Sequence, residues 1–397
     1  MQHSDKQMQS FCLSRPETCC GFNTLDGYGT LMANAHPLLV HDYFAIRGGG
    51  ERLALVLAES LNATMMFGYR DETSYDEGMY PAGQINLDLP RVLRRPVVRV
   101  GALALRFSLA RRQAARFDTR IFAGVTAPFA APSKRLEGTN IYYCHTPPRF
   151  LYDQRSDFQP KAVTAGSIVR GAALTFYQRE YLRAVERMDV IIANSNTVRD
   201  RVAHYLGRDS IVVYPPCDTN RFRWLGQDDY YLSTARLSRL KRVDKIVDAF
   251  LKMPEKKLVV ASGGDELEAL RARAAGASNI HFTGWVGEEQ LRELVGRSIA
   301  SIYVPVEEDF GMSPVESMSA GKPVIGVREG GLRETILHGT TGTLLAPDFT
   351  ADDIAAAVTK LTSAKARDMR QKCEQRASLF SNERFIDGMN AIVGHKR

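Results

Sequence analysis

The sequence lacks several features that would assign it to a specialised class of protein. In its 397 residues no apolar stretch reaches the roughly 18 residues of a membrane-spanning helix. Residues 1–37 lack the apolar segment of a signal peptide, and the six cysteines show no spacing typical of metal ligands. With a hydrophobic content of 44% and a charged content of 24%, these absences predict a soluble cytoplasmic protein with reduced thiols.

Acidic residues are scarce in one stretch of the chain. Between Arg91 and Arg120 there are nine arginines and a single acid, Asp118, with leucine, valine and phenylalanine interleaved. A basic segment with an apolar face suits an anionic membrane surface. A solvated basic helix face and a groove for an acceptor phosphate are the alternatives. No nucleic-acid-binding motif accompanies the arginines, so nucleic acid is the least favoured partner.

Apolar strands alternate with helical segments along most of the chain. The first half contains predicted strands at residues 38–43, 62–69, 140–145 and 190–195, and helices at 51–61 and 196–206. The second half contains strands at 230–235, 257–262, 280–282, 299–306 and 323–327, and helices at 245–251 and 266–275. Such alternation predicts an α/β protein whose parallel sheets are covered by helices on both faces.

Two prolines, Pro215 and Pro216, interrupt this alternation and indicate a domain boundary. We therefore predict two facing Rossmann-like domains, residues 37–214 and 215–382. A poorly ordered tail over residues 1–36 precedes them, and a helical segment within residues 383–397 follows. A ligand is expected in the crevice between the domains, at the carboxyl ends of the strands.

Two glutamates, Glu308 and Glu316, follow the predicted strand 299–306. The helix after them is expected to have Ser313 as its N-cap, Pro314 at its first position and Glu316 at its third. Backbone N–H groups from Phe310 onward then point out of the helix start, where the dipole favours an anion. This pattern predicts chemistry on a phosphorylated ligand. The alternatives are a capping-box glutamate and a solvated loop acid.

The residues around the two glutamates extend into a long signature. Glu308 and Glu316 are followed by MSAGKPVI at residues 318–325 and by GGLRE at residues 330–334. The run closely resembles the nucleotide-binding signature of retaining glycosyltransferases of family 4, and the resemblance covers about residues 38–393. It implies two facing Rossmann-like domains of the GT-B type, with a C-terminal helix that crosses back to the first domain.

Arg236 and Lys241 follow the predicted strand 230–235 and precede a helix. Arginine offers a bidentate fork and lysine a point charge to a diphosphate. The spacing of the two residues matches the positions that hold the donor diphosphate in family 4. Arg239 and Arg242 are expected to be bystanders, and a solvated basic turn is the alternative for the whole group.

His145 ends the predicted strand 140–145, where its side chain is expected to face the cleft. A lone histidine is more often structural, but His145 matches the family histidine near the transferred sugar. The block YYCHTPPRFLYD at residues 142–153 resembles GDP-mannose-dependent bacterial mannosyltransferases of exopolysaccharide and O-antigen assembly, of the xanthan, acetan and WbaZ-like kind. Those enzymes extend glycans on a polyprenyl diphosphate.

A glycine-rich loop, RGGGER at residues 47–52, lies between the first predicted strand and helix. Glycines alone also serve plain turns, but this loop looks like the family loop that closes over phosphate and acceptor. Residues 282–286 look like the family turn around the nucleotide base. The resemblance implies donor contacts from Arg236, Lys241 and six further residues: Gly48, Gly49, Phe310, Gly311, Met312 and Glu316.

The resemblance implies a retaining glycosyltransferase that needs no metal and no other cofactor. Arg236, Lys241 and the helix start stabilise the leaving diphosphate. Glu308 and His145 contact the transferred hexose, and Glu316 the ribose. The implied donor is GDP-mannose. The implied acceptor is a polyprenyl-diphosphate-linked oligosaccharide of bacterial surface polysaccharide synthesis, reached at the inner face of the cytoplasmic membrane.

Three alternatives remain open from the sequence. Another sugar nucleotide, such as UDP-glucose, could be the donor within the same family. A nucleotide-sugar epimerase shares the fold, but no matching elimination base is found in the first domain. A non-catalytic protein that binds a sugar nucleotide or an anionic lipid would not need the full set His145, Arg236, Lys241 and Glu308.

Overall fold

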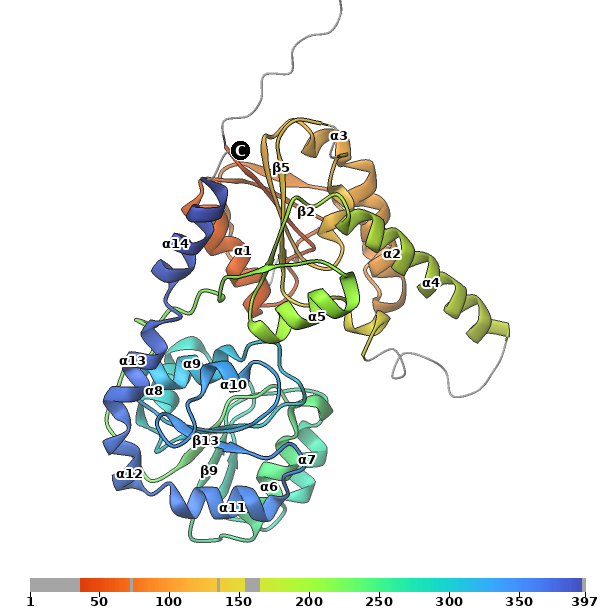
Figure 1. Ribbon diagram of the computed structural model, residues 1–397. Coiled ribbons are helices and arrows are strands. Elements are labelled where there is room, and N and C mark those ends of the chain that lie inside the picture. The colour runs from red at the N-terminus through yellow and green to blue at the C-terminus, as the bar shows by residue number, and fades with distance from the viewer. Residues whose placement is uncertain (1–35, 72–73, 134–135, 154–164, 395–397) are drawn as a thin grey trace, which may run out of the picture. The chain divides into compact units, whose positions relative to one another are not determined.

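The computed structural model describes residues 36–71, 74–133, 136–153 and 165–394 (Figure 1). The predicted N-terminal tail, except for its last residue His36, lies outside the described residues. Two parallel β-sheets are each flanked by helices, which confirms the predicted α/β fold class of two parallel-sheet domains.

The first sheet has seven strands in the order β3-β2-β1-β4-β5-β6-β7. They are β1 (Leu38–His41), β2 (Thr64–Phe67), β3 (Gln84–Asn86), β4 (Thr119–Ala123), β5 (Thr139–Cys144), β6 (Val190–Ala193) and β7 (Ile211–Val212). The helices are α1 (Gly49–Ser60), α2 (Pro96–Leu109), α3 (Arg111–Ala114), α4 (Ala165–Val185) and α5 (Asn196–Leu206). The strand order reverses at β1 and β4, and ligands bind at such switch points.

The second sheet has six strands in the order β10-β9-β8-β11-β12-β13. They are β8 (Tyr231–Ser233), β9 (Leu258–Val260), β10 (Ile280–Phe282), β11 (Ser301–Tyr303), β12 (Val324–Val327) and β13 (Gly342–Leu345). The helices are α6 (Val243–Leu251), α7 (Leu267–Arg273), α8 (Glu288–Arg297), α9 (Met312–Ser319), α10 (Leu332–Thr335), α11 (Ala351–Lys360), α12 (Ser363–Asp368) and α13 (Arg370–Ser378).

The last helix, α14 (Asn382–Val393), packs against the first sheet's helix α1. Phe385 and Met389 of α14 are buried in the same apolar cluster as Leu53 and Leu57 of α1. Helix α14 therefore packs beside α1 in the helical layer of the first sheet. The connection from β7 to β8 contains the predicted boundary at residues 214–215.

The start of α9 differs from the sequence prediction. Gly311, not Ser313, is the N-cap, and Glu316 is the fifth residue of the helix and not the third, so the predicted start of the helix was wrong. The alternative of a capping box between Ser313 and Glu316 does not apply either. Gly311 has φ +88°, a conformation that glycine adopts without the steric cost of a side chain, and it turns the chain into the helix two residues early. The Glu316 side chain is therefore free of a capping role.

The basic segment between Arg91 and Arg120 also differs from a single amphipathic helix. It forms a 3₁₀ turn, α2, α3 and the start of β4. Arg120 is fully buried and donates 2.8 Å to the amide oxygen of Asn140. Arg94 and Arg111 donate to backbone carbonyls. Arg120 is therefore part of the core and cannot contribute to a membrane surface, which corrects the prediction for this residue, whereas Arg94 and Arg111 are half-buried.

Candidate functional site

Glu308 and Lys241 meet at the carboxyl ends of adjacent strands of the second sheet. Lys241 follows β8 and Glu308 follows β11, and these strands pair in parallel. The Lys241 Nζ lies 2.5 Å from the Glu308 Oε2 and 3.0 Å from the Tyr303 hydroxyl. Two groups that are 67 positions apart in sequence therefore form one charged pair at the predicted site.

Arg236 lies at the same strand end, three residues after β8. Its side chain is exposed, and no ion pair to it is found within the part of the chain that the structure describes. Arg239, three residues further along the chain, is exposed as well. The structure thus places Lys241, which is paired with Glu308, near two arginines that face solvent, Arg236 and Arg239.

The loop that carries Glu308 is held by residues that were not predicted as site residues. Arg242, expected to be a bystander, donates to the carbonyls of Val304 (2.7 Å) and Pro305 (2.5 Å) and forms an ion pair with Glu329 (3.1 Å). The Glu329 carboxylate in turn accepts a hydrogen bond from the backbone of Glu307. Only the fold reveals this role, because nothing in the basic turn separates Arg242 from its neighbours.

The two glycines of the GGLRE segment pack directly on the same loop. The Gly331 amide donates to the Glu308 carbonyl at 2.7 Å. Gly330 has φ +52°, and a Cβ on it would lie 2.1 Å from the Glu308 carbonyl oxygen. These glycines are therefore required for the backbone to approach closely enough to place Glu308.

The start of α9 presents backbone N–H groups beside this loop. The side chain of Phe310 is buried and its ring contacts those of Tyr214 and Phe380, so only its backbone can reach a ligand. The Met312 sulfur lies 2.7 Å from where a Cβ on Gly49 would stand. The predicted donor-binding residues Gly49 and Met312 are thus neighbours, although they come from different halves of the sequence.

The glycine loop is braced by an aromatic residue that the sequence did not indicate. The Tyr75 hydroxyl donates to the Gly48 carbonyl at 3.4 Å. The Arg47 guanidinium lies 5.8 Å from the centre of the Tyr75 ring and donates to the Ser74 carbonyl. Tyr75 belongs to no motif and is 27 positions from Gly48, so only the structure could bring it to the loop.

His145 follows β5 and points toward the glycine loop. Its imidazole lies 3.7 Å from where a Cβ on Gly50 would stand, and its Nε2 is buried without a hydrogen-bond partner among the described residues. Burial, with a smaller contribution from nearby His41, lowers the pKa of His145 to about 4. The imidazole is therefore neutral at pH 7, which suits a hydrogen bond to a hydroxyl and not an ion pair with phosphate.

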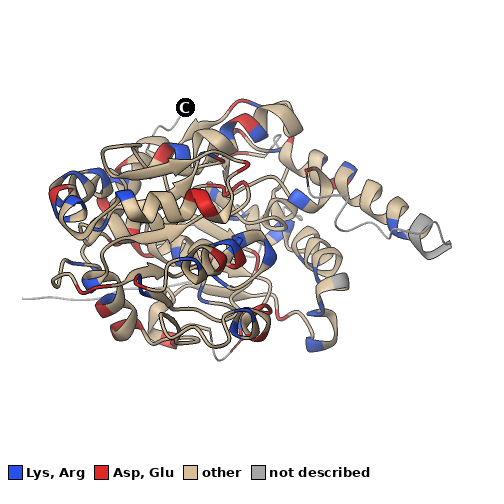
Figure 2. Cartoon of the chain, turned by 90° about the horizontal axis from the view of Figure 1, so that it is seen from below, with Lys and Arg blue, Asp and Glu red and all other residues tan. Residues whose placement is uncertain are grey.

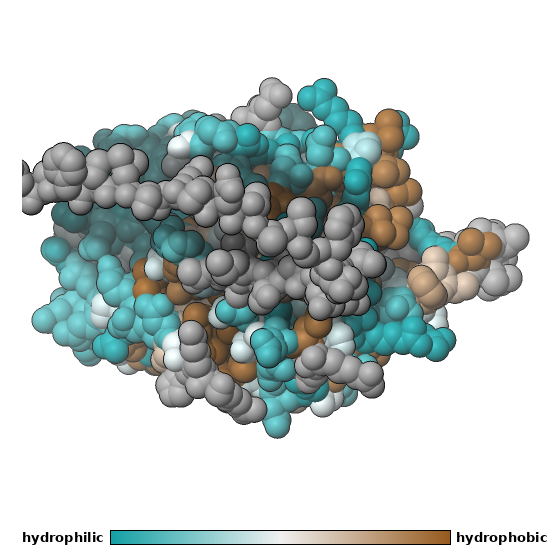
Figure 3. Space-filling model, turned by 90° about the horizontal axis from the view of Figure 1, so that it is seen from above, coloured by the Kyte–Doolittle hydropathy of each residue, from teal (hydrophilic) through white to brown (hydrophobic). Residues whose placement is uncertain are grey.

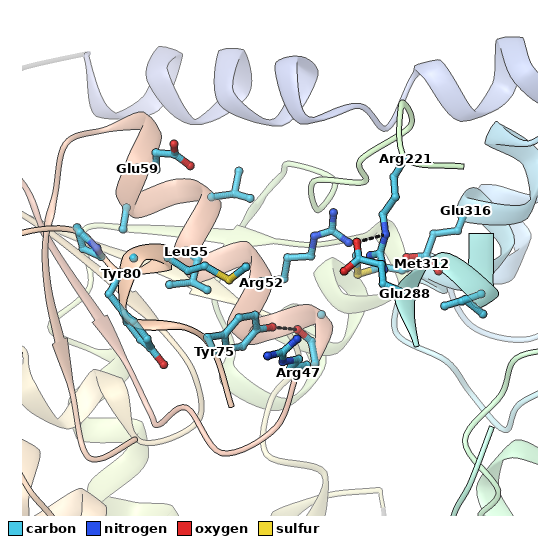
Figure 4. Close-up of a pocket in the computed structure, with 18 of the residues that line it drawn as sticks. Arg47, Arg52, Leu55, Glu59, Tyr75, Tyr80, Arg221, Glu288, Met312 and Glu316 are labelled. Carbon is cyan, nitrogen blue, oxygen red and sulfur yellow. Dashed lines mark hydrogen bonds and ion pairs between the residues drawn. The ribbon is translucent and has the colours of Figure 1, made fainter. Parts of the chain in front are cut away.

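A cavity of about 860 Å³ runs from the glycine loop to α9 (Figure 4). Gly48, Gly49, Met312 and Glu316 all line it, together with Arg47, Arg52 and Arg221. Burial raises the pKa of the Glu316 carboxyl, and the nearby Arg221 and Arg52 oppose that effect. The cavity therefore holds charges of both signs, because Glu59 and Glu288 also line it and Glu288 pairs with Arg221 at 2.9 Å.

A second cavity of about 350 Å³ shares Arg221 and Glu316 with the first. Its other walls include Thr234, Ser262 and Trp285, and Trp285 comes from the turn expected around the nucleotide base. The ring of Trp285 lies over Gly263, where a Cβ would stand 2.4 Å from the indole nitrogen. Glu316 thus stands at the junction of two cavities, a position that fits a ribose between a base and a diphosphate.

Helix α5 contacts the Glu308 loop and the GGLRE segment, and neither contact was predicted. Arg201 pairs with Asp309 and donates to the Glu307 carbonyl. The Glu334 carboxylate accepts hydrogen bonds of 2.8 Å from the backbone N–H groups of residues 196 and 197, at the start of α5. Burial raises the pKa of Asp309 to about 6. Of the residues that make these contacts, the sequence singles out only Glu334, as the last residue of the GGLRE segment.

Comparison with known families identifies the second half of the chain. Residues 218–380 match the family of Glycosyl transferases group 1. This part of the chain is therefore similar to a group 1 glycosyl transferase domain. The matched range contains Arg236, Lys241, Glu308 and Glu316, and it excludes His145 and the glycine loop.

Individual relatives extend the similarity into the first half. The alpha-1,3/1,6-mannosyltransferase ALG2 of Dictyostelium discoideum is 29% identical over 256 residues, which cover 52% of this chain and 60% of that protein. The chain therefore spans less than two thirds of that relative. A Mycobacterium tuberculosis enzyme, the GDP-mannose-dependent alpha-(1-6)-phosphatidylinositol monomannoside mannosyltransferase, is 26% identical over 365 residues, or 82% of this chain and 88% of that enzyme.

The fold itself is that of a solved structure. The Anabaena protein Alr3699/HepE, crystallised with UDP and glucose, superposes with a TM-score of 0.68 at 16% identity, over 91% of this chain and 100% of that one. At this level of identity the likeness shows the fold alone. It confirms the GT-B architecture that the sequence signature implied.

Proposed function

We propose that the protein is a retaining glycosyltransferase that moves mannose from GDP-mannose to a lipid-linked glycan acceptor. The observation that carries the proposal is the meeting of Lys241 and Glu308 beside the start of α9. Glu316 lies further along the same helix, in the cavity. A cation, a carboxylate and open backbone N–H groups converge where a sugar nucleotide would place its diphosphate, hexose and ribose.

In the proposed reaction the bond between the anomeric carbon and the diphosphate oxygen breaks, and the acceptor hydroxyl oxygen bonds to that carbon from the same face. The acceptor proton passes to the departing diphosphate. Lys241, Arg236 and the start of α9 stabilise the negative charge that develops on this group. Glu308 orients hexose hydroxyls and stabilises positive charge on the sugar ring, and neutral His145 donates or accepts one hydrogen bond.

Nucleotide release tests this proposal against its two rivals. The protein is incubated with a panel of nucleotide sugars, with and without a mannoside acceptor, and free nucleotide is measured. A glycosyltransferase releases the nucleotide of one donor and transfers the sugar with its anomeric configuration retained. An epimerase would convert the donor without releasing nucleotide, and a non-catalytic binding protein would do neither.

The cationic groups of the site lead to a prediction about metal dependence. Lys241, Arg236 and the helix dipole supply the positive charge that a divalent ion would otherwise provide. We expect transfer to continue at an unchanged rate in excess EDTA, measured by nucleotide release. Loss of activity that magnesium or manganese restores would contradict this proposal.

The preferred nucleotide is predicted to be guanine-based. The block around His145 resembles GDP-mannose enzymes, and the mycobacterial relative is named as GDP-mannose-dependent. We expect calorimetry to show GDP binding at least about tenfold more tightly than UDP, a difference of about 1.4 kcal/mol. Tighter binding of UDP would indicate a UDP-sugar donor and would leave the glycosyltransferase proposal intact.

The acceptor is proposed to be held in a membrane. The mycobacterial relative is named for transfer to phosphatidylinositol monomannoside, a glycan on a lipid. No helix among the described residues is long and apolar enough to cross a bilayer. An enzyme of this kind reaches such an acceptor by binding to the membrane surface, and an exposed basic surface would serve that purpose.

A further inference from the structure

Tyr303, the last residue of β11, is a buried aromatic residue whose hydroxyl reaches the candidate site. Its ring is 6% exposed and belongs to the apolar core of the second sheet. Hydrophobic side chains elsewhere reach the surface, for example on the projecting part of α4 (Figure 3). Phe176 of that helix is 67% exposed. An exposed ring can turn, whereas a ring inside a close-packed core is held by its neighbours, so the direction of the Tyr303 hydroxyl is fixed.

The Tyr303 hydroxyl joins Lys241 to Glu308. It accepts a hydrogen bond of 3.0 Å from the Lys241 Nζ and donates one to the Glu308 carboxylate. These directions are fixed, because an ammonium group can only donate and a carboxylate can only accept. Burial, with a further contribution from Glu308, raises the pKa of Tyr303 well above its usual value, so the phenol keeps its proton. Together with the ion pair of 2.5 Å between Lys241 and Glu308, the three groups form a closed ring of hydrogen bonds.

Lys241 and Glu308 have few other restraints on their charged ends. Their side chains are 25% and 23% exposed, and no further hydrogen bond to the Lys241 Nζ or the Glu308 carboxylate is found among the described residues. Figure 2 shows residues of both signs interspersed over the molecule, so distant charges partly cancel and do not orient the two groups. Their orientation therefore depends on the Tyr303 hydroxyl.

A bound donor would keep this dependence. In the proposed reaction the diphosphate takes Lys241 from Glu308, and the hexose hydroxyls take the carboxylate. Each group then loses its partner in the ion pair, but both can remain hydrogen-bonded to the Tyr303 hydroxyl. The ammonium group has several N–H donors, so one directed at Tyr303 leaves others for the diphosphate.

We propose that Tyr303 is a positioning residue, whose hydroxyl holds the Lys241 ammonium and the Glu308 carboxylate at a fixed distance from each other throughout the reaction. It acts on the departing diphosphate and on the hexose only through these two groups. Its effect on turnover rests on the proposed function, whereas the placement of Lys241 by the hydroxyl does not.

The test compares Tyr303→Phe with a matched control, Tyr231→Phe. Tyr231 lies on the neighbouring strand β8, is 2% exposed, and its hydroxyl donates to the carbonyls of Val358 (3.1 Å) and Leu361 (2.8 Å). It is the first residue of β8, so it lies at the edge of the sheet away from the site. Each variant removes one buried hydroxyl and keeps the aromatic ring, so the pair separates the place of the hydroxyl from its loss.

We expect Tyr303→Phe to lower turnover at saturating donor about tenfold, the size of one hydrogen bond to a charged group. KM for the donor should change less than about twofold, because a misplaced Lys241 mainly stabilises the departing charge less well. Tyr231→Phe should keep both constants within about twofold of the unaltered protein, although its melting temperature falls by a few degrees. Equal turnover in the two variants would overturn the inference.

A double-mutant cycle shows whether Tyr303 acts through Lys241. Tyr303→Phe is combined with Lys241→Met, and the loss of turnover is compared with the product of the two single losses. We expect the double variant to lose at least about threefold less than that product, because without the ammonium group the hydroxyl positions Glu308 alone. The losses should multiply when Tyr231→Phe is combined with Lys241→Met. If they also multiplied for Tyr303, the hydroxyl would act independently of Lys241 and the inference would fail.

Chemical labelling measures the placement of Lys241 without turnover. The protein is treated briefly with acetic anhydride, and acetylation of Lys241 is followed by mass spectrometry of its peptides. We expect Lys241 to react about threefold faster in Tyr303→Phe, the size of one neutral hydrogen bond, and at the unaltered rate in Tyr231→Phe. Equal rates in all three proteins would overturn the inference. Faster labelling in a protein that releases no nucleotide from any donor would refute the proposed function and leave the placement of Lys241 by Tyr303 standing.

Discussion

Replacing Lys241 with methionine is expected to lower the rate of nucleotide release about a hundredfold or more, and Arg236→Ala should have an effect of the same order. Lys241 lies between Glu308 and the Tyr303 hydroxyl at the end of β8, where the diphosphate of a donor would displace the carboxylate as its partner. A charge that develops as the diphosphate leaves is stabilised more strongly in the transition state than in the bound donor. The measurement is the turnover rate at saturating donor.

The matched control is Arg239→Ala, an exposed arginine in the same turn. It removes the same charge at the same strand end, so it accounts for any general electrostatic effect. Circular dichroism melting should show that all three variants keep their fold, since Lys241 and Arg236 are not buried. If the Lys241 and Arg236 variants turned over within about threefold of the control, neither residue would stabilise the departing diphosphate.

The pairing of Lys241 with Glu308 could be expected from the sequence for a physical reason. Each follows an apolar strand, and parallel strands bring their carboxyl ends to one edge of the sheet. Once β8 and β11 are neighbours, two residues 67 positions apart must come together. The same reasoning placed His145 at the end of β5. The alternation of strands and helices in a sequence therefore predicts best those site residues that lie at the ends of strands.

Positions that depend on one backbone angle or one buried carbonyl could not be predicted in this way. The helix α9 begins at Met312 because Gly311 adopts a positive φ, which no pattern of side chains announces. Arg120 counted toward a basic surface in the composition, yet it is buried in β4 against Asn140 and the carbonyl of Phe117. Charge counts describe a segment, whereas burial is decided residue by residue through hydrogen bonding.

The exposure of apolar residues in the first half of α4 could not be predicted from the sequence either. Val169 and Phe176 stand in a segment of ordinary helical composition, and apolar residues at helical spacing are usually core. Their exposure follows from their place in α4, because only the last part of the helix, from about Tyr181, is buried against the rest of the fold. A surface of this kind depends on the extent of packing and not on the residues themselves.

Gly330→Ala is expected to lower turnover about a hundredfold, because it must displace the backbone of Glu308. A Cβ on Gly330 would lie 2.1 Å from the Glu308 carbonyl oxygen and 2.9 Å from its amide nitrogen. Backbone atoms cannot give way as the end of a flexible side chain can. The loop must therefore shift by about 1 Å, and a misplacement of that size can cost about a hundredfold in rate.

Gly339→Ala separates this effect from strain in the glycine itself. Gly339 also has a positive φ, +76° against +52° for Gly330, but a Cβ there meets nothing within 4 Å. Gly339→Ala should cost about 1–2 kcal/mol of stability, since it forces a side chain into the left-handed region. Gly330→Ala should cost more, because the displacement of the Glu308 backbone adds to the same strain. Only the Gly330 variant should lose turnover when melting and nucleotide release are measured together. Both variants place an alanine at a positive φ, so they share this backbone strain. Equal turnover in the two variants would therefore mean that the position of Glu308 does not control the reaction.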